Sequence, residues 1–147
     1  MPTVTTIPLV RDVMTTRPLT VTPDLGVLDL HRLFLKHDIE ACPVVGDDDI
    51  LLGIVSRVDL LRMLRPDRES AHLDVSAVTS QTVKDIMRYG IVTVEPEDPL
   101  ITAVDLMVET RLHALPIVHR QRSERLVVGL ITQDQVLRAL MSLEGLA

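Results

Sequence analysis

The sequence predicts a protein of the α/β (α+β) class that consists of two copies of one β-α-β-β-α unit. Two observations lead to this prediction. A short apolar strand that ends in a hydroxyl residue and continues directly into an apolar-periodic helix occurs at 52–61 and again at 128–137. Three other short patterns also occur twice, each at a spacing of 73 residues. Patterns that recur at one fixed spacing indicate a duplicated structural unit, here of roughly 60 residues.

The repeated patterns are short and follow the same order in both halves. They are Asp-Val/Ile-Met at 12–14 and 85–87, Thr-Val-x-Pro at 20–23 and 93–96, and Ala-x-Pro-Val/Ile-Val at 41–45 and 114–118. Gly53 and Gly129 are 76 residues apart, so the second copy carries three extra residues between Val118 and Gly129. We expect these three residues to lie in the turn after Val118.

Periodicity and breaker residues divide each half into elements. The first half is expected to hold a helical turn at 11–14, strands at 18–22, 41–45 and 50–56, a helix opened at 23 with Asp24 as its cap, and a helix from 57 to about 65. The second half is expected to hold a short helix, a strand near 91–94, a helix at 99–110, strands at 115–118 and 125–131, and a helix at 133–142.

The apolar stripes of the two longer helices predict a shared type of core. Val27, Leu30, Leu33 and Phe34 fall on one helix face, and their counterparts 73 residues later are also apolar. The predicted organisation is a first unit at 1–65 with an extended N-terminal segment, a polar linker at 66–82, and a second unit at 83–147. Units this small seldom stand alone well, so two half-size units that share a core would fit a chain of this length.

The composition limits the classes of function. The 147 residues are 46% hydrophobic and 1% aromatic, and the net charge is −6. Scarce aromatic residues count against a platform for single-stranded nucleic acid, because such platforms stack bases on aromatic rings. The acidic balance counts against nonspecific binding to DNA or to anionic lipid.

The single cysteine and the hydropathy pattern concern the location of the chain. Cys42 has no second cysteine to pair with, so an intrachain disulfide is excluded and a reducing, cytoplasmic location is favoured. No apolar run approaches the roughly 20 residues of a membrane-spanning helix, so no membrane span is expected. The N-terminus lacks a basic segment followed by an apolar block, so we also expect no secretion signal.

Taken in order, the patterns resemble the cystathionine-β-synthase (CBS) domain family. The resemblance is carried by the three repeated patterns and by Gly-h-h-Ser/Thr-x-x-Asp, where h is apolar, and it covers about 10–65 and 83–142. It implies a stand-alone tandem CBS pair, a Bateman module, whose two units pack with pseudo-twofold symmetry and often dimerise. It further implies a regulatory module whose clefts hold AMP, ADP, ATP or S-adenosylmethionine. We therefore expect an adenosyl nucleotide as regulatory ligand, no required cofactor, a homodimer and an effector protein that the sequence does not identify.

The ligand site is expected at the first strand–helix motif. By the resemblance, Asp59 bonds the ribose hydroxyls and Ser56 lies near the ribose or phosphate. A carboxylate that accepts hydrogen bonds from two vicinal hydroxyls suits a ribose. From the residues alone, Ser56 is better explained as a helix cap, and Asp59 as an acid that the helix dipole favours in the first turn. The adenine is expected in an apolar slot near Val21, Thr22, Ile39, Cys42, Pro43 and Ile54.

The second motif departs from the pattern. Thr132 is kept, but Gln135 stands in the place of the acid, and Asp134 lies one residue earlier, about 100° around the helix. An amide binds a diol less well than a carboxylate does, so we expect the second cleft to be the weaker one.

Phosphate contacts are expected from cationic side chains near the motifs. His113 lies in a place where some nucleotide-binding relatives carry a phosphate-contacting histidine, and Arg57 and Arg111 lie close to motif residues. Each of the three is also explained as a solvent-exposed residue. The counterpart of His113 in the first unit is Glu40, which would repel phosphate, so only one cleft suits an anionic ligand.

Other functions remain as alternatives. A ligand-free structural or oligomerisation module is compatible with the altered second motif. No Ser/His/Asp set, no Cys/His pair and no metal-ligand spacing is found among the five histidines, so we expect no enzyme. The three aspartates at 47–49 are interpreted as a hairpin turn rather than a metal site, because residues 119–122 of the second copy would not bind a hard cation.

Overall fold

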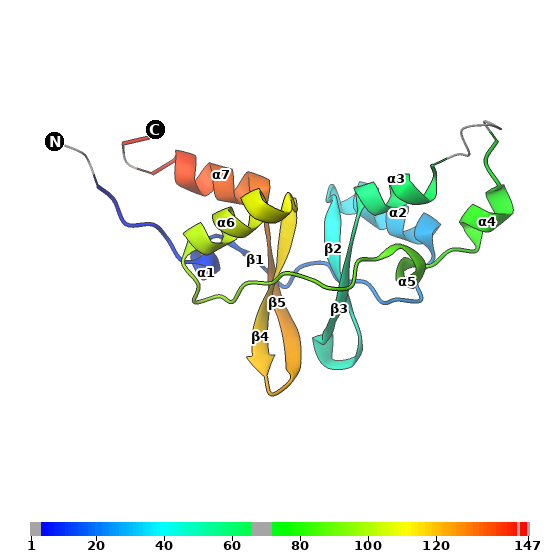
Figure 1. Ribbon diagram of the computed structural model, residues 1–147, viewed down its shortest axis with the longest axis horizontal. Coiled ribbons are helices and arrows are strands. Elements are labelled where there is room, and N and C mark those ends of the chain that lie inside the picture. Colours follow the sequence, from blue (N-terminus) through cyan, green and yellow to red (C-terminus); the bar gives the residue numbers. More distant parts are fainter. Residues whose placement is uncertain (1–3, 66–71, 144, 147) are drawn as a thin grey trace. The chain divides into compact units, whose positions relative to one another are not determined.

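The computed structural model describes residues 4–65, 72–143 and 145–146, and its architecture is α+β, as the sequence predicts. The chain forms two compact units. One unit, here called the Asp59 unit, comprises Leu19–Ile91, and the other, here called the Gln135 unit, combines Met1–Pro18 with Val92–Ala147. Figure 1 shows that each unit is a twisted β-hairpin with helices beside it.

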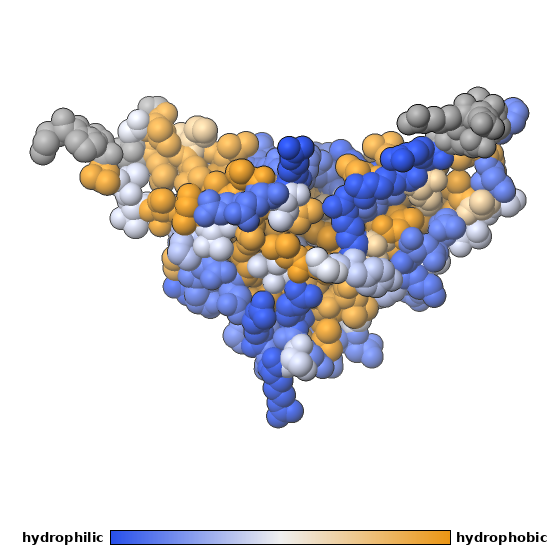
Figure 2. All heavy atoms as spheres, viewed as in Figure 1, coloured by the Kyte–Doolittle hydropathy of each residue, from blue (hydrophilic) through white to orange (hydrophobic). Residues whose placement is uncertain are grey.

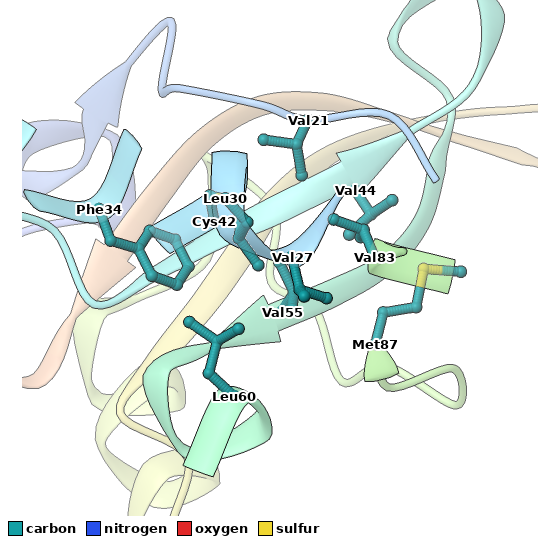
Figure 3. Packing of buried hydrophobic residues seen from close by; sticks show 10 residues of the cluster. All are labelled: Val21, Val27, Leu30, Phe34, Cys42, Val44, Val55, Leu60, Val83 and Met87. Atoms are coloured by element: carbon teal, nitrogen blue, oxygen red, sulfur yellow. The ribbon is translucent and has the colours of Figure 1, made fainter. Parts of the chain in front are cut away.

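The Asp59 unit is built on the antiparallel strands β2 (Ala41–Val45) and β3 (Leu51–Ser56), which the short 3-10 helix η1 (Asp47–Asp49) connects. Its helices are α2 (Val27–His37), α3 (Arg57–Met63), α4 (Val75–Thr79) and α5 (Val83–Ile86). The predicted stripe of α2 is largely buried, and strands and helices contribute to one mainly aliphatic core (Figure 3). Burial of such side chains contributes about 1.5–3 kcal/mol each, which makes this core the main source of stability.

The Gln135 unit is built on a three-stranded antiparallel sheet in the order β1-β5-β4. The strands are β1 (Thr15–Thr16), β4 (Ala114–Gln121) and β5 (Glu124–Thr132), and the helices are α1 (Val10–Val13), α6 (Leu100–Thr110) and α7 (Gln133–Met141). The stripe of α6 enters this core through Leu100, Ala103 and Met107, with Leu106 partly buried beside them. The two cores therefore use equivalent helix faces, as the repeat predicts.

The two hairpins share the same irregularity of register. The pairing shifts between Val44 and Val45 in one hairpin and between the equivalent Ile117 and Val118 in the other. Beyond the shift, Val45 pairs with Leu51, whereas the β4–β5 hairpin continues for three further pairs, from His119 to Gln121, before its turn. The three extra residues of the second copy are thus confined to the end of the hairpin after Val118, which confirms the prediction.

The repeated glycines are required by a close approach of backbone. A Cβ atom at Gly53 would lie 2.7 Å from the carbonyl oxygen of Arg88, and one at Gly129 would lie 2.8 Å from the sulfur of Met14. In the Asp59 unit, Arg88 and Ile54 exchange backbone hydrogen bonds of 3.1 and 2.9 Å. In the Gln135 unit, Thr15 pairs with Leu130 in the same way. Each hairpin is therefore closed by the segment that follows the short Asp-x-Met helix of the other sequence copy.

Because of this exchange, the boundaries of the compact units differ from the boundaries of the sequence repeats. The predicted units were 1–65 and 83–147, whereas the compact units divide after Pro18 and after Ile91. The reason is that α1 packs with α7 and α5 packs with α3. The predicted linker 66–82 contributes α4. The carboxylate of Asp74 caps the start of this helix, because it accepts a hydrogen bond of 3.1 Å from the backbone N–H of Ala77. Residues 66–71 of the linker lie outside the described part of the chain.

Three local predictions are wrong. Residues 18–22 and 91–94 form single parallel bridges, Val21 with Val44 and Val94 with Ile117, rather than strands. The following prolines, two residues after each bridge, have no N–H with which to extend a ladder. Helix α2 starts at Val27 instead of at Asp24. Asp24 accepts the hydroxyl of Thr22, and the N–H of Val27 donates to the carbonyl of Gln81, so the backbone before α5 satisfies the helix start.

Candidate functional site

Asp59 lies where strand β3 passes into helix α3, in the first copy of the repeated motif. The backbone N–H of Ser56 donates to Oδ2 of Asp59 at 2.8 Å, and the Ser56 hydroxyl donates to the same oxygen at 3.0 Å. The Ser-x-x-Asp spacing creates both bonds, because it places the acid one helical turn after the residue that starts the helix. One carboxylate oxygen is therefore held by local bonds.

Two arginines hold the other carboxylate oxygen of Asp59. Nη1 of Arg62 lies 3.1 Å from Oδ1, and Nε of Arg88 lies 3.3 Å from it. The Asp59 side chain is 2% exposed, whereas those of Arg62 and Arg88 are 52% and 41% exposed. A carboxylate this deeply buried needs such partners, because an unpaired buried charge costs several kcal/mol. Two guanidinium groups on one carboxylate give the cluster a net positive charge.

A pocket of about 520 Å³ lies beside this cluster, within the Asp59 unit. Its volume falls in the range of small-molecule sites, about 300–1,000 Å³. Helices α3, α4 and α5 and the residues after α5 line it through Asp59, Arg62, Met63, Ala77, Val78, Gln81, Asp85, Ile86, Met87 and Arg88. Hydrogen bonds from the backbone N–H and the hydroxyl of Thr82 lower the pKa of Asp85, so its carboxylate is charged at neutral pH. The pocket thus joins an apolar surface to a charged edge.

The second motif has the same local geometry with neutral groups. The N–H of Thr132 donates to Oε1 of Gln135 at 2.9 Å, as Ser56 does to Asp59. The amide nitrogen of Gln135 then donates to the hydroxyl of Thr15 at 2.7 Å. Thr15 is the repeat counterpart of Arg88, so an acid–arginine pair in one unit corresponds to an amide–hydroxyl pair in the other. Asp134 forms an exposed ion pair of 2.9 Å with Arg138 and does not replace the missing acid.

The predicted phosphate contacts are distributed over both units. Arg57 is exposed at the start of α3, and its N–H donates to the carbonyl of Glu40 at 2.9 Å. Arg111 and His113 belong to the Gln135 unit, where they line a groove of about 400 Å³ with Gln133. Within its own unit, Asp59 forms ion pairs with Arg62 and Arg88 instead. A phosphate contact through Arg57, Arg111 or His113 stays a prediction.

The residues of the predicted adenine slot have different environments. Val21 and Cys42 belong to the buried core of the Asp59 unit, as Figure 3 shows. Burial raises the pKa of the Cys42 thiol to about 12, so the thiol stays neutral. Pro43 and Ile54 are buried in the hairpin, while Ile39 is half-buried and Thr22 is exposed. None of the six lines the 520 Å³ pocket; the slot stays a prediction.

Arg62 and Arg88 are site residues that the sequence analysis missed. Arg62 follows Asp59 by three residues, and that spacing alone indicates an ion pair on a helix. Arg88 is 29 residues from Asp59, and only the exchange of segments between the repeats brings the two together. A comparison of repeat positions could have drawn attention to it, because an arginine at 88 and an acid at 59 replace the uncharged Thr15 and Gln135 together.

The described residues contain no cluster of three or more histidine, cysteine, aspartate or glutamate side chains that could hold a metal ion. The aspartates of η1 are exposed. A helix long and apolar enough to cross a membrane is likewise not found in the described part of the chain.

Comparison with known proteins agrees with this architecture. The family model of the CBS domain matches residues 10–66 and 83–142. The uncharacterized protein MJ1426 of Methanocaldococcus jannaschii is 25% identical to this chain in an alignment 157 positions long. The alignment covers 90% of this chain and 91% of that protein. Several other curated relatives are longer enzymes, and the chain spans only 21% to 23% of their length.

Two solved structures share the fold. The CBS domain pair of protein MJ0100, in complex with 5′-methylthioadenosine and S-adenosyl-L-methionine, matches with a TM-score of 0.76 and 23% identity over 92% of this chain and 97% of that chain. CBSX2 in complex with AMP matches with a TM-score of 0.74 and 28% identity over 90% of this chain and 96% of that chain. CBSX2 is a CBS-pair protein from Arabidopsis thaliana.

Proposed function

This chain belongs to the CBS-domain family, and from that premise we propose that it is a regulatory module that binds an adenosyl nucleotide at Asp59. The observation that carries the proposal is the buried Asp59 carboxylate with two partly exposed arginines at the edge of a 520 Å³ pocket. The complex of CBSX2 with AMP supports the ligand class, because CBSX2 is 28% identical to this chain over most of its length.

The proposed roles follow from the hydrogen bonds of the cluster. Oδ2 of Asp59 stays bonded to Ser56, while the ribose hydroxyls replace the guanidinium groups at Oδ1. Arg62 and Arg88 are then free to bind phosphate, for which a planar guanidinium is well suited. Arg57 remains a further candidate for the phosphate of this ligand, and Arg111 and His113 remain candidates for the phosphate of a ligand in the Gln135 unit. The two guanidinium groups favour AMP, ADP or ATP over S-adenosylmethionine, because S-adenosylmethionine has a cationic sulfonium and no phosphate with which they could pair.

The Gln135 unit is proposed to bind the same ligand class more weakly. Its motif offers Thr132 and the amide of Gln135, and that amide already donates to Thr15. An amide oxygen is a weaker acceptor for a diol than a carboxylate is. The asymmetry between the two motifs favours one strong nucleotide site per chain.

Output through a partner completes the proposal. We propose a homodimer that acts without catalysis on an effector protein in a reducing, cytoplasmic compartment. Support comes from the regulatory role that the family resemblance implies and from a single cysteine whose thiol is buried and neutral.

A ligand-free structural module is the second candidate, and one observation favours it. Both oxygens of the Asp59 carboxylate already have two donors within the chain, so the site is satisfied without any ligand. The Asp59–Arg88 pair would then serve only to hold the segment after α5 against β3.

A thermal-shift screen with AMP, ADP, ATP and S-adenosylmethionine separates the two candidates. At a hundredfold excess over Kd a ligand adds about 2.7 kcal/mol of stability, and each kcal/mol raises Tm by about 2–4 °C for a chain of this size. We expect a rise of roughly 5–10 °C with the phosphorylated ligands and less with S-adenosylmethionine. No rise with any of the four would support the structural module instead.

A further inference from the structure

The end of the β4–β5 hairpin concentrates positive charge in its arginines Arg120, Arg122 and Arg125, here called the arginine tip. Residues 119–125 read His-Arg-Gln-Arg-Ser-Glu-Arg, so seven residues hold three of the 15 lysines and arginines of a chain whose net charge is −6. Arg120 and Arg122 are exposed, and Arg125 is half-buried. Figure 2 shows hydrophilic residues gathered at the end of this hairpin. Positive charge collected at one place on an acidic protein indicates a surface for an anionic partner.

The hairpin carries this charge away from its own core. Strand β1 pairs with the inner part of β5, and Val94 bridges Ile117, also on the inner part of the hairpin. In Figure 1 the hairpin continues past α6 and α7 before it turns at Arg122 and Ser123. The three residues by which the second copy is longer therefore lengthen the part that carries the arginines. The turn lines a hollow of about 500 Å³ through Gln121, Arg122, Ser123 and Glu124.

Two arginines of the tip face each other across the hairpin. Arg120 and Arg125 are register partners in the β4–β5 ladder. Directly opposite side chains of an antiparallel pair share one face of the sheet, and like charges in such a pair are destabilising. Arg120 also forms an ion pair with Glu95, but its Nε lies 3.9 Å from Oε1 and its side chain is 64% exposed, so this pair contributes little. Binding therefore explains the placement of these arginines better than stability of the hairpin does.

The equivalent end of the other hairpin has the opposite charge. Asp47, Asp48 and Asp49 form the exposed 3-10 helix η1 of the Asp59 unit. By the repeat spacing, Asp47 corresponds to Arg120 and Asp49 to Arg122. The same type of hairpin thus forms with acidic residues at these positions, so hairpin formation does not require the arginines. Their positive charge is a feature of the second copy alone.

We propose that the arginine tip is a docking surface for an acidic segment of a partner protein. Planar guanidinium groups bind carboxylates with two parallel hydrogen bonds, and arginine is enriched in protein interfaces. An acidic protein segment is favoured over nucleic acid, because the acidic remainder of the chain repels a long polyanion and residues 119–125 contain no Phe, Tyr or Trp on which bases could stack. The inference rests on the proposed action through an effector protein and is independent of the proposed nucleotide.

Fluorescence anisotropy with a labelled oligoglutamate peptide tests the tip. Arg120→Gln/Arg122→Gln is expected to weaken peptide binding about tenfold or more, because it removes two charge-assisted contacts. Arg11→Gln/Arg17→Gln removes the same charge from exposed positions of the same unit outside the tip, and it is expected to change Kd by less than about threefold. Arg17 and Arg122 both adopt positive φ, 49° and 56°, so the two variants are matched in backbone as well as in charge.

A second pair of measurements separates binding from a role in the hairpin. Arg120→Gln removes one member of the like-charged pair, so Tm is expected to stay equal or to rise while peptide binding weakens. Arg120→Lys/Arg122→Lys keeps the charge but lacks the planar fork, so it is expected to bind more tightly than the glutamine variant and less tightly than the wild type. A fall in Tm for Arg120→Gln with an unchanged peptide Kd would assign the arginine to the fold and overturn the proposal.

The remaining outcomes are also decisive. Equal Kd values for the wild type and Arg120→Gln/Arg122→Gln, or equal losses in both glutamine double variants, overturn the tip as the site. A labelled oligothymidylate that binds at least as tightly as the peptide overturns a protein partner. Self-association of the wild type that Asp47→Asn/Asp48→Asn/Asp49→Asn abolishes would make a second copy the occupant instead. Absence of peptide binding overturns the proposal, whereas a thermal shift by AMP would still support the nucleotide site.

Discussion

Asp59 and Arg88 form an ion pair of 3.3 Å across two segments that come from different copies of the sequence repeat. At the equivalent place in the other unit, Gln135 donates a hydrogen bond of 2.7 Å to Thr15. Each pair joins the start of a motif helix to the segment that closes its hairpin. The two pairs differ in charge but occupy equivalent positions in the two units, so each pair supplies a matched control for substitutions in the other.

Exchange of the charged pair for the neutral pair is expected to preserve the fold. Arg88→Thr alone leaves the buried Asp59 with one arginine, and Asp59→Gln alone leaves two arginines facing an amide. Each single change is expected to cost about 1–3 kcal/mol of unfolding free energy. The double variant Asp59→Gln/Arg88→Thr reproduces the Gln135–Thr15 pair and is expected to lie within about 1 kcal/mol of wild type. Urea unfolding measures the cycle, and strictly additive losses would argue against a direct pair.

The motif glycines are expected to tolerate no side chain. In Gly53→Ala the new Cβ would meet the Arg88 carbonyl oxygen at 2.7 Å, and in Gly129→Ala it would meet the Met14 sulfur at 2.8 Å and the Thr15 carbonyl oxygen at 3.0 Å. Such overpacking against backbone costs about 1–3 kcal/mol or more. Gly26→Ala is the matched control, because its Cβ would meet only Asp29 Oδ2 at 3.9 Å. Equal midpoints for all three variants in urea unfolding would contradict the close approach.

The buried thiol of Cys42 is expected to report unfolding. Its pKa is raised by burial to about 12 from 9.0, so between these values the unfolded chain loses a proton that the folded chain keeps. The thiol contribution to stability is therefore full below about pH 9 and decreases as pH rises toward 12. Iodoacetamide at pH 8.5 should modify Cys42 in urea but not in the native protein. Rapid modification of the native protein would show that the thiol is accessible.

The Gln135 unit is expected to gain a nucleotide site when it receives the charged pair. Gln135→Asp with Thr15→Arg places an acid and an arginine at the positions that Asp59 and Arg88 occupy in the other unit. Because Thr15 is exposed, the longer arginine side chain has room. Calorimetric titration with AMP should then give about two strong sites per chain instead of one. An unchanged stoichiometry would mean that the acid and arginine are insufficient for binding.

Most local elements follow from the sequence, because their signals are local; the exceptions are the segments at 18–22 and 91–94 and the start of α2. The helices of the two strand–helix motifs begin directly after Ser56 and Thr132, as these hydroxyl residues indicate. The three added residues lengthen the hairpin after Val118, as the repeat spacing indicates. The exchange of segments could not be predicted, because the Asp-x-Met pattern is the same in both copies and does not indicate which hairpin it closes. For the same reason Arg88 was not assigned to Asp59.

The sequence does not distinguish an apolar ligand slot from part of a core. A short buried strand has the same apolar pattern whether its side chains line a ligand slot or fill a core. The structure places Val21 and Cys42 in the core, with Cys42 at 0% exposure, and the predicted slot contained both. Only packing of the surrounding helices distinguishes these two environments.

Calorimetric titration of AMP into the wild type and into Asp59→Gln/Arg88→Thr tests the central claim most directly. The variant is expected to fold, so a change in binding reports on the site rather than on stability, and Gln135→Ala serves as the control at the other motif. We expect one strong site per chain in the wild type and in the control, and a loss of affinity of about tenfold or more in the variant, because charge-assisted hydrogen bonds are the strong ones. Equal Kd values for the wild type and the Asp59→Gln/Arg88→Thr variant, or no binding to the wild type, would contradict a nucleotide site at Asp59.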